Sequence, residues 1–113
     1  MKWNNLTRAE ELNLLQLESQ QAPVIIFKHS TRCSISRAAL DRLERQWNEA
    51  EMGAVKIYFV DLLSYRDVSN QIAEQFNIEH ESPQVLVIRN GQVVFHRSHL
   101  GIDYSSIKAA TRN

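Results

Sequence analysis

The chain has 113 residues, 43% of them hydrophobic and 23% charged, which is typical of a folded globular domain and excludes a disordered segment. Lysine plus arginine and aspartate plus glutamate number 13 each, so no net charge draws the chain to nucleic acid or to an acidic membrane. The opening segment MKWNNLTRAEELNLLQL has no unbroken apolar stretch, and the single cysteine cannot form an internal disulfide. We therefore expect one domain over residues 1–113, located in the cytoplasm, without a secretory signal or a membrane span.

The first part of the chain predicts a helix followed by a buried strand. Thr7 and Glu10 have the spacing of a capping box, and apolar residues at helical spacing follow them until about Gln20. Pro23 cannot continue that helix. Residues 24–27, VIIF, are apolar at every position, so we expect a strand covered on both faces.

A second helix and a second strand follow. Ser30 and Thr31 are candidate N-caps for the helix. Gly53 ends the helical region, and residues 55–60, VKIYFV, predict the second strand. The apolar residues of the helix recur every four positions, which places them on one face: Ile35, Ala39, Leu43 and Trp47.

The second half predicts a helix over 66–76, a hairpin and a closing helix over 103–110. Residues 85–88 are expected to form another doubly buried strand. Asn90-Gly91 favours a tight primed turn, because both residues tolerate positive φ, and residues 93–97 return as an antiparallel partner. The element order predicts a right-handed parallel crossover between the first two strands. We therefore expect an α/β fold with a central mixed four-stranded sheet flanked by helices.

Cys33 stands directly after an apolar strand and at the start of a helix. Unpaired backbone amides and the positive end of the helix dipole favour a thiolate over a thiol at such a position. Arg32 and Arg37 add positive charge nearby, and the Ser36 hydroxyl, three residues on, is placed to donate a hydrogen bond to the sulfur. Free cysteines are commonly buried as small apolar residues, but the neighbours here are polar. The pattern favours a functional thiol.

The remaining chemistry-bearing residues give weaker signals. Ser82-Pro83 separates a polar stretch from a buried strand, a place where a cis bond would be a turn held by tertiary structure. The four histidines match no compact metal-binding spacing and have one cysteine to join them, so we expect structural histidines and no metal site.

Several landmarks, taken in order, resemble the thioredoxin superfamily across about residues 6–110. They are the strand VIIF, Cys33 opening a helix, Ser82-Pro83 before QVLVI, the RNGQVV hairpin and Gly101. The resemblance implies a thioredoxin-like fold in which Cys33 is the attacking thiol and Pro83 is a cis-proline. It also implies that the backbone of Ser82 pairs with the substrate in the manner of a strand.

Two departures from the dithiol thioredoxins narrow the function. Ser36 replaces the resolving cysteine of the CxxC motif, and Phe27 replaces the buried acid six residues before the nucleophile. Without a second thiol, the chain has no group that resolves a mixed disulfide from within. A general dithiol disulfide reductase is therefore disfavoured.

The segment FKHSTRCSIS, residues 27–36, resembles the YtxJ-like monothiol proteins of bacillithiol-using bacteria, whose motif is similar to K-H-S-T-x-C-P-I-S. Ser34 stands where that motif has proline. The resemblance implies a monothiol bacilliredoxin without a bound cofactor, in which Cys33 attacks mixed disulfides between client proteins and the co-substrate bacillithiol. A second low-molecular-weight thiol or another redoxin then resets Cys33.

The same resemblance indicates where the substrate binds. Bacillithiol carries a malate group, whose carboxylates are expected to pair with Arg32, Arg37 or Lys28. For Lys28, a solvated lysine at the end of a strand is an equally good interpretation. The expected substrate-binding residues are Lys28, Thr31, Ser82 and Pro83.

Two other functions remain open on the sequence. An iron–sulfur carrier resembling the CxxS glutaredoxins would share a cluster across a dimer through Cys33, but the segment HRSHLGID lacks the Gly-Gly-type turn of those proteins. The second open function is a thioredoxin-like binding module without enzymatic activity, in which Cys33 is incidental. For the leading interpretation the expected partners are S-bacillithiolated client proteins and a low-molecular-weight thiol, with no nucleic acid and no membrane.

Overall fold

The computed structural model describes residues 1–112 of the chain. Within this range no helix combines the length and the apolar character needed to cross a bilayer. The strands are β1 (Asn4–Asn5), β2 (Val24–His29), β3 (Lys56–Asp61), β4 (Gln84–Arg89) and β5 (Gln92–Ser98). The helices are α1 (Glu11–Glu18), α2 (Ser34–Gln46), α3 (Glu49–Met52), α4 (Arg66–Phe76), the 3-10 helix η1 (His99–Gly101) and α5 (Tyr104–Thr111).

The strands form one mixed sheet in the order β1-β3-β2-β4-β5. β2 and β3 are parallel, with Phe27 opposite Phe59, whereas β4 runs antiparallel to both β2 and β5. The predicted parallel pair and the predicted antiparallel hairpin are both confirmed. In the hairpin turn, Asn90 and Gly91 have φ of 52° and 77°, the left-handed region that a tight primed turn requires.

The prediction of four strands is wrong, because the sheet has five. β1 consists of Asn4 and Asn5, which pair in parallel with Tyr58 and Phe59 at the edge of the sheet. Both asparagines are exposed, and two polar residues carry no alternation from which a strand is recognised. Asparagine is also depleted in strands. Pairing with the edge of β3, and not local preference, therefore produces this strand.

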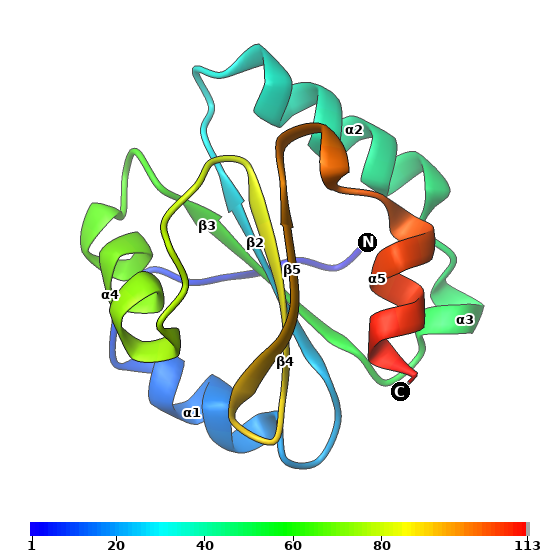
Figure 1. Ribbon diagram of the computed structural model, residues 1–113, viewed down its shortest axis with the longest axis horizontal. Helices are drawn as coiled ribbons and strands as arrows, with labels where there is room; N and C mark the ends of the chain where they lie inside the picture. The colour runs from blue at the N-terminus through cyan, green and yellow to red at the C-terminus, as the bar shows by residue number, and fades with distance from the viewer. Residues whose placement is uncertain (113) are drawn as a thin grey trace.

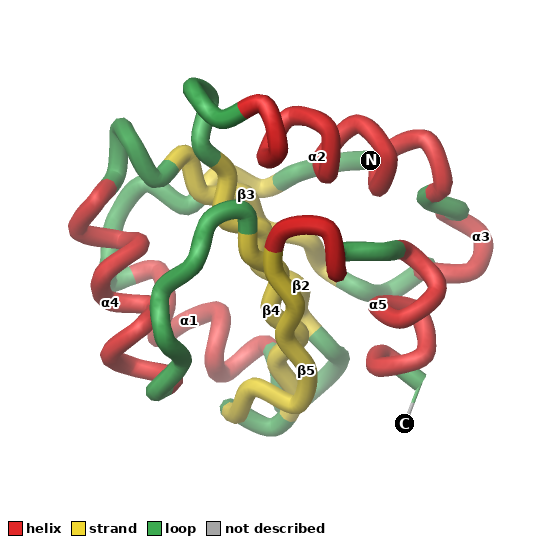
Figure 2. The backbone as a smooth tube through the Cα atoms, turned by 45° about the horizontal axis from the view of Figure 1, so that its top comes forward, coloured by secondary structure: helices red, strands yellow, loops and turns green. Residues whose placement is uncertain are grey.

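Helices cover both faces of the sheet (Figure 1). α2, α3 and α5 pack on one face around a core that contains Phe27, Leu43 and Ile107, whereas α1 and α4 pack on the other around Leu12 and Ile72. In a second view the strands run between these two helical layers (Figure 2). β2 lies at the centre of the sheet, and all of its residues are buried. The expectation of a strand covered on both faces is confirmed.

The first helix starts later than its capping-box spacing predicts. α1 begins at Glu11, and Glu10 stands at the N-cap position without a side-chain capping bond. The carboxylate of Glu11 instead accepts hydrogen bonds from the backbone N–H groups of Thr7 (3.2 Å) and Arg8 (3.0 Å). The acid that satisfies these amides is thus one residue further along the chain.

The start of α2 also differs from expectation. Neither Ser30 nor Thr31 is the N-cap; Cys33 holds that position, with φ −108° and ψ 118° and no side-chain capping bond. The reason is a turn before the helix, in which the Cys33 N–H donates to the Ser30 carbonyl (3.2 Å). This turn places Cys33, the only cysteine of the chain, directly before the first residue of α2.

The sheet brings two loops to the same edge. β2 and β4 are antiparallel neighbours in which Lys28 lies opposite Gln84, so the end of β2 and the start of β4 meet. The loop after β2 leads to α2 at the top of Figure 1, and the loop before β4, which carries Ser82 and Pro83, climbs beside α4 and enters β4 in the upper half of the view. η1 joins this region, since the His99 N–H donates to the Pro83 carbonyl (3.1 Å).

Candidate active site

Cys33 is partly exposed at the N-terminus of α2. Its carbonyl accepts the first helical hydrogen bond, from the N–H of Arg37 (3.1 Å). The thiol therefore stands at the N-terminal, positive end of a 13-residue helix. This is the placement that the sequence predicts, and the residue is partly exposed.

Three of the expected site residues lie exposed around Cys33: Thr31, Arg32 and Arg37. Within residues 1–112, neither arginine forms an ion pair with a carboxylate of the chain. Both guanidinium groups are therefore available to an anionic partner.

Ser36 does not donate to the sulfur as the sequence suggested. Its side chain is fully buried, and its Oγ accepts a hydrogen bond from the Ser30 N–H (3.1 Å) and lies 2.7 Å from Nδ1 of His29. Among the described residues, no hydrogen bond joins this hydroxyl to Cys33. Both of its partners come from the end of β2 and the loop that follows. The hydroxyl therefore fastens the first turn of α2 to the strand, and its effect on Cys33 is positional.

His29 is a buried member of the site that the sequence placed among ordinary structural histidines. Its ring centroid lies 5.3 Å from that of Phe59. Burial lowers the pKa of His29, and the nearby Asp61 carboxylate opposes this effect, so the ring is neutral at neutral pH. A histidine and a serine seven positions apart, across a strand, a loop and a helix start, follow no periodicity. No local sequence pattern identifies the pair.

Lys28 does not lie at the surface of the protein. Its side chain is fully buried on the central strand, so it is not a solvated strand-end lysine. The Nζ atom lies 3.0 Å from Nδ1 of His80 and 3.4 Å from Oε1 of Gln84. Burial lowers the pKa of Lys28 to about 8. The interpretation as a solvated lysine is therefore wrong, whereas substrate binding by Lys28 stays a prediction. The partners of Lys28 belong to the loop before β4 and to β4 itself.

The peptide bond between Ser82 and Pro83 is cis, as the resemblance implies. Pro83 is buried, and Ser82 is partly exposed. The Oγ of Ser82 is nevertheless buried and has no hydrogen-bond partner among the described residues. Buried hydroxyls usually have a hydrogen-bond partner, so the unpaired hydroxyl of Ser82 is unusual.

A family model described as monothiol bacilliredoxin BrxC matches residues 4–107. The chain belongs to this family. The matched segment contains Cys33, the loop after β2 and the loop that carries Ser82 and Pro83. The family match therefore covers both loops of the candidate site.

Solved structures show the fold of the bacilliredoxin-family chain. A candidate oxidoreductase with a thioredoxin fold is 31% identical, with a TM-score of 0.80, and the match covers 94% of this chain and 90% of that one. The thioredoxin of Fasciola hepatica is 18% identical, with a TM-score of 0.70 and coverage of 96% and 95%. The thioredoxin of Trypanosoma brucei brucei is 14% identical, with a TM-score of 0.73 and coverage of 98% and 88%. The predicted thioredoxin-like fold is confirmed.

Membership of the bacilliredoxin family and the thioredoxin fold support a thiol redox function for this chain. Cys33 is its only cysteine, so thiol chemistry within the chain depends on that residue. The site therefore combines a partly exposed cysteine and exposed arginines with a proline loop that leads into β4, the antiparallel neighbour of β2.

Proposed function

We propose that the protein catalyses monothiol thiol–disulfide exchange on client proteins that carry bacillithiol as a mixed disulfide. The Cys33 thiolate attacks the bacillithiol sulfur, a disulfide forms between Cys33 and bacillithiol, and the client leaves as a thiolate. A second bacillithiol thiolate then attacks the same bacillithiol sulfur, which yields bacillithiol disulfide and restores Cys33. The client sulfur is reduced to a thiol, the sulfur of the second bacillithiol is oxidised to the disulfide level in exchange, and no bound cofactor is needed for the electron balance.

The proposal is carried by the presence of one reachable thiol with a buried serine where a dithiol enzyme has its second cysteine. Ser36 is fully buried and is engaged with His29 and the backbone of Ser30. A hydroxyl cannot resolve a mixed disulfide, because resolution requires a second thiolate. The resolving sulfur therefore has to come from solution, which is the defining feature of monothiol exchange.

The position of the loop that carries Ser82 and Pro83 supports a role for this loop in aligning the substrate disulfide. The antiparallel pairing of β2 with β4 brings this loop to the edge of the sheet from which the chain runs to Cys33. Exchange needs the attacking sulfur and the two sulfurs of the target nearly in line, so a fixed backbone beside the thiolate favours the reaction. Thiol attack and substrate alignment are thus assigned to different loops.

The exposed arginines support recognition of an acidic thiol. Arg32 and Arg37 are exposed, and within residues 1–112 no carboxylate is paired with them. Guanidinium groups bind carboxylates through charge-assisted hydrogen bonds, and the malate group of bacillithiol carries two carboxylates. Lys28 is fully buried, which favours the two exposed arginines for this role. We therefore assign recognition of the malate carboxylates to Arg32 and Arg37.

The proposed activity is tested by catalytic release of a client thiol. A peptide with bacillithiol on its single cysteine is mixed with a small amount of the protein and an excess of bacillithiol, and the free peptide is followed by chromatography. We expect multiple turnovers with the wild type, and with Cys33→Ser only the rate of the uncatalysed exchange. Equal release by the two proteins would contradict the proposal and favour a binding module without activity.

A further inference from the structure

A polar cluster with a buried lysine at its centre lies beneath the loop that precedes β4, on the face of the sheet that α4 covers. At its centre, the Lys28 ammonium lies 3.0 Å from Nδ1 of His80 and 3.4 Å from Oε1 of Gln84. Ser69 of α4 adds a hydroxyl 3.4 Å from the same nitrogen of His80. Gln84 donates its Nε2–H to the backbone carbonyl of Glu79 (3.0 Å). Lys28 of β2 and Gln84 of β4 therefore contact the loop at His80 and Glu79.

Stability alone does not explain a lysine at this position. Lys28 is fully buried, and within residues 1–112 no carboxylate lies within ion-pair distance of it. Taking an ammonium group out of water without an acidic partner is strongly unfavourable. An apolar side chain of similar length would fill the same space without that penalty. What a lysine provides here, and an apolar side chain does not, is its hydrogen bonds to His80 and Gln84.

We propose that Lys28 is a positioning residue for thiol–disulfide exchange. From beneath, it fastens the loop of residues 79–83 so that Ser82 and Pro83 stand in a fixed geometry beside Cys33. The inference rests on the proposed function, because the fastened loop is the one assigned to substrate alignment.

The fastening acts on both sides of Ser82. On one side, Lys28 and Gln84 hold the loop through the contacts at Glu79 and His80. On the other side, the Pro83 carbonyl accepts the His99 N–H (3.1 Å). Ser82 lies between these points, and its Oγ has no hydrogen-bond partner among the described residues. The orientation of its backbone therefore depends on the flanking contacts, and through them on Lys28.

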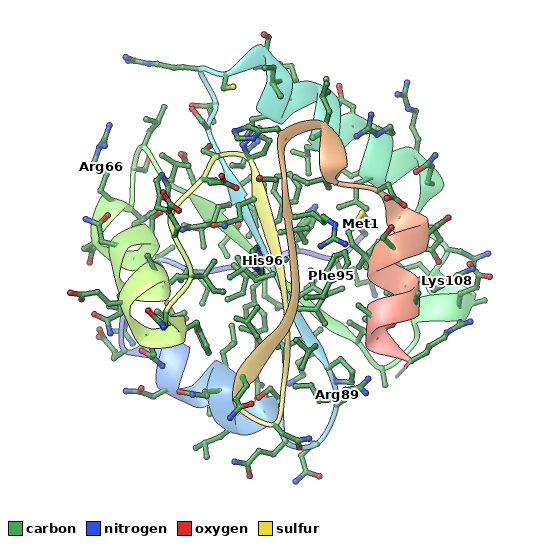
Figure 3. All side chains as sticks on the ribbon, viewed as in Figure 1. Met1, Arg66, Arg89, Phe95, His96 and Lys108 are labelled. Atoms are coloured by element: carbon green, nitrogen blue, oxygen red, sulfur yellow. The ribbon has the colours of Figure 1, made fainter. Side chains whose placement is uncertain are left out.

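The charges around the cluster make His80 the acceptor. Burial, the Lys28 ammonium and the Arg66 guanidinium lower the pKa of His80, whereas the Glu81 carboxylate opposes them. Arg66 extends outward from the start of α4 (Figure 3), and the hydroxyl and amide that complete the cluster are uncharged. His80 is therefore neutral at neutral pH. It offers the lone pair of Nδ1 to the ammonium and carries its proton on Nε2.

Matched variants of His80 test the fastening with little disturbance of the core, since His80 is exposed. His80→Asn keeps an acceptor close to the position of Nδ1, whereas His80→Leu removes it. We expect His80→Leu and Lys28→Met each to lower kcat/KM for release of a bacillithiolated peptide about tenfold, the effect of losing one hydrogen bond to a charged group. The change should appear mainly in KM. The kcat/KM of His80→Asn should stay within about twofold of the wild type, because asparagine restores the acceptor.

A second readout separates positioning from damage to the thiol. Alkylation of Cys33 by iodoacetamide requires no substrate loop, so its rate should be the same in the wild type, Lys28→Met and His80→Leu. A parallel fall in alkylation would overturn the inference, because the variants would then act on the thiol itself. Equal peptide release by the wild type and His80→Leu would overturn it too, while leaving the exchange activity intact. If the wild type releases no peptide, the proposed function is what fails.

Discussion

The hydroxyl of Ser36 lies 2.7 Å from Nδ1 of His29 and ties the first turn of α2 to the end of β2. The same oxygen accepts the Ser30 N–H (3.1 Å), so it spans the loop in which Cys33 stands. In this chain the position three residues after Cys33 therefore has a structural task that fixes the surroundings of Cys33. In the dithiol thioredoxins the same position holds the resolving cysteine, which takes part in the reaction.

Ser36→Ala should destabilise the fold, because it leaves the buried Nδ1 of His29 and the Ser30 N–H without this partner. We expect the free energy of unfolding to fall by about 1–3 kcal/mol, the usual effect of leaving buried polar groups unpaired. Urea denaturation measures it. Ser34→Ala, at an exposed serine of the same helical turn, is the matched control and should change stability by less than about 0.5 kcal/mol. Equal effects of the two substitutions would contradict the role of the His29–Ser36 pair.

Lys28 should make the stability of the protein depend on pH in the alkaline range. Its pKa is lowered from 10.5 to about 8 by burial, so between these values the unfolded chain binds more protons than the folded one. Stability attributable to Lys28 therefore rises with pH through this window, and the penalty is fully present below about pH 8. From pH 7 to pH 10 the unfolding free energy of the wild type should rise by roughly 2–3 kcal/mol relative to Lys28→Met.

The comparison with Lys28→Met cancels the other groups that titrate in the same range. Urea denaturation of both proteins at several pH values between 7 and 10 gives the difference directly. A difference that stays constant across this range would show that Lys28 is not buried as an ammonium in the folded protein.

Replacing both Arg32 and Arg37 by glutamine should weaken exchange with an acidic thiol more than with a neutral one. We expect the rate of exchange with bacillithiol to fall about two- to fivefold, as for exposed charge pairs, and the difference to shrink at high salt. Exchange with the uncharged thiol 2-mercaptoethanol should change little. Arg45→Gln, at an exposed position in the last turn of α2, is the control. An equal loss with both thiols would argue against carboxylate recognition.

Ser82→Ala should stabilise the protein and leave exchange unchanged. The substitution removes a buried hydroxyl that has no partner among the described residues, which should raise the free energy of unfolding by about 1 kcal/mol. The backbone of residue 82, to which substrate alignment is assigned, is retained. Thermal or urea denaturation and peptide release are measured on the same preparation. A marked loss of release would show that the Ser82 hydroxyl itself binds the substrate.

Much of the fold follows from local patterns in the sequence. The doubly buried strands, the turn at Asn90 and Gly91, and the placement of Cys33 at a helix start all depend on residues close together in the chain, and all are confirmed. β1 was not predictable in this way, because its two exposed asparagines become a strand only through the edge of β3.

The buried polar contacts of the site were beyond local reasoning. Lys28 was expected at the surface, because a charged residue is rarely buried without an acidic partner. Its partners His80 and Gln84 lie more than fifty positions away in the chain, and only the pairing of β2 with β4 brings them together. The link between His29 and Ser36 likewise depends on how the loop turns before α2. Sequence patterns locate the reacting sulfur, whereas tertiary contacts decide what holds its surroundings.

Intact-mass analysis of Cys33 after a single turnover tests the central claim most directly. The protein is mixed with one equivalent of a bacillithiolated peptide, without free bacillithiol, and both components are followed over time. The account predicts that the protein gains the mass of one bacillithiol, mapped to Cys33, as the peptide loses the same mass. A peptide that loses its adduct while Cys33 stays unmodified, or a peptide that keeps its adduct throughout, would contradict the account.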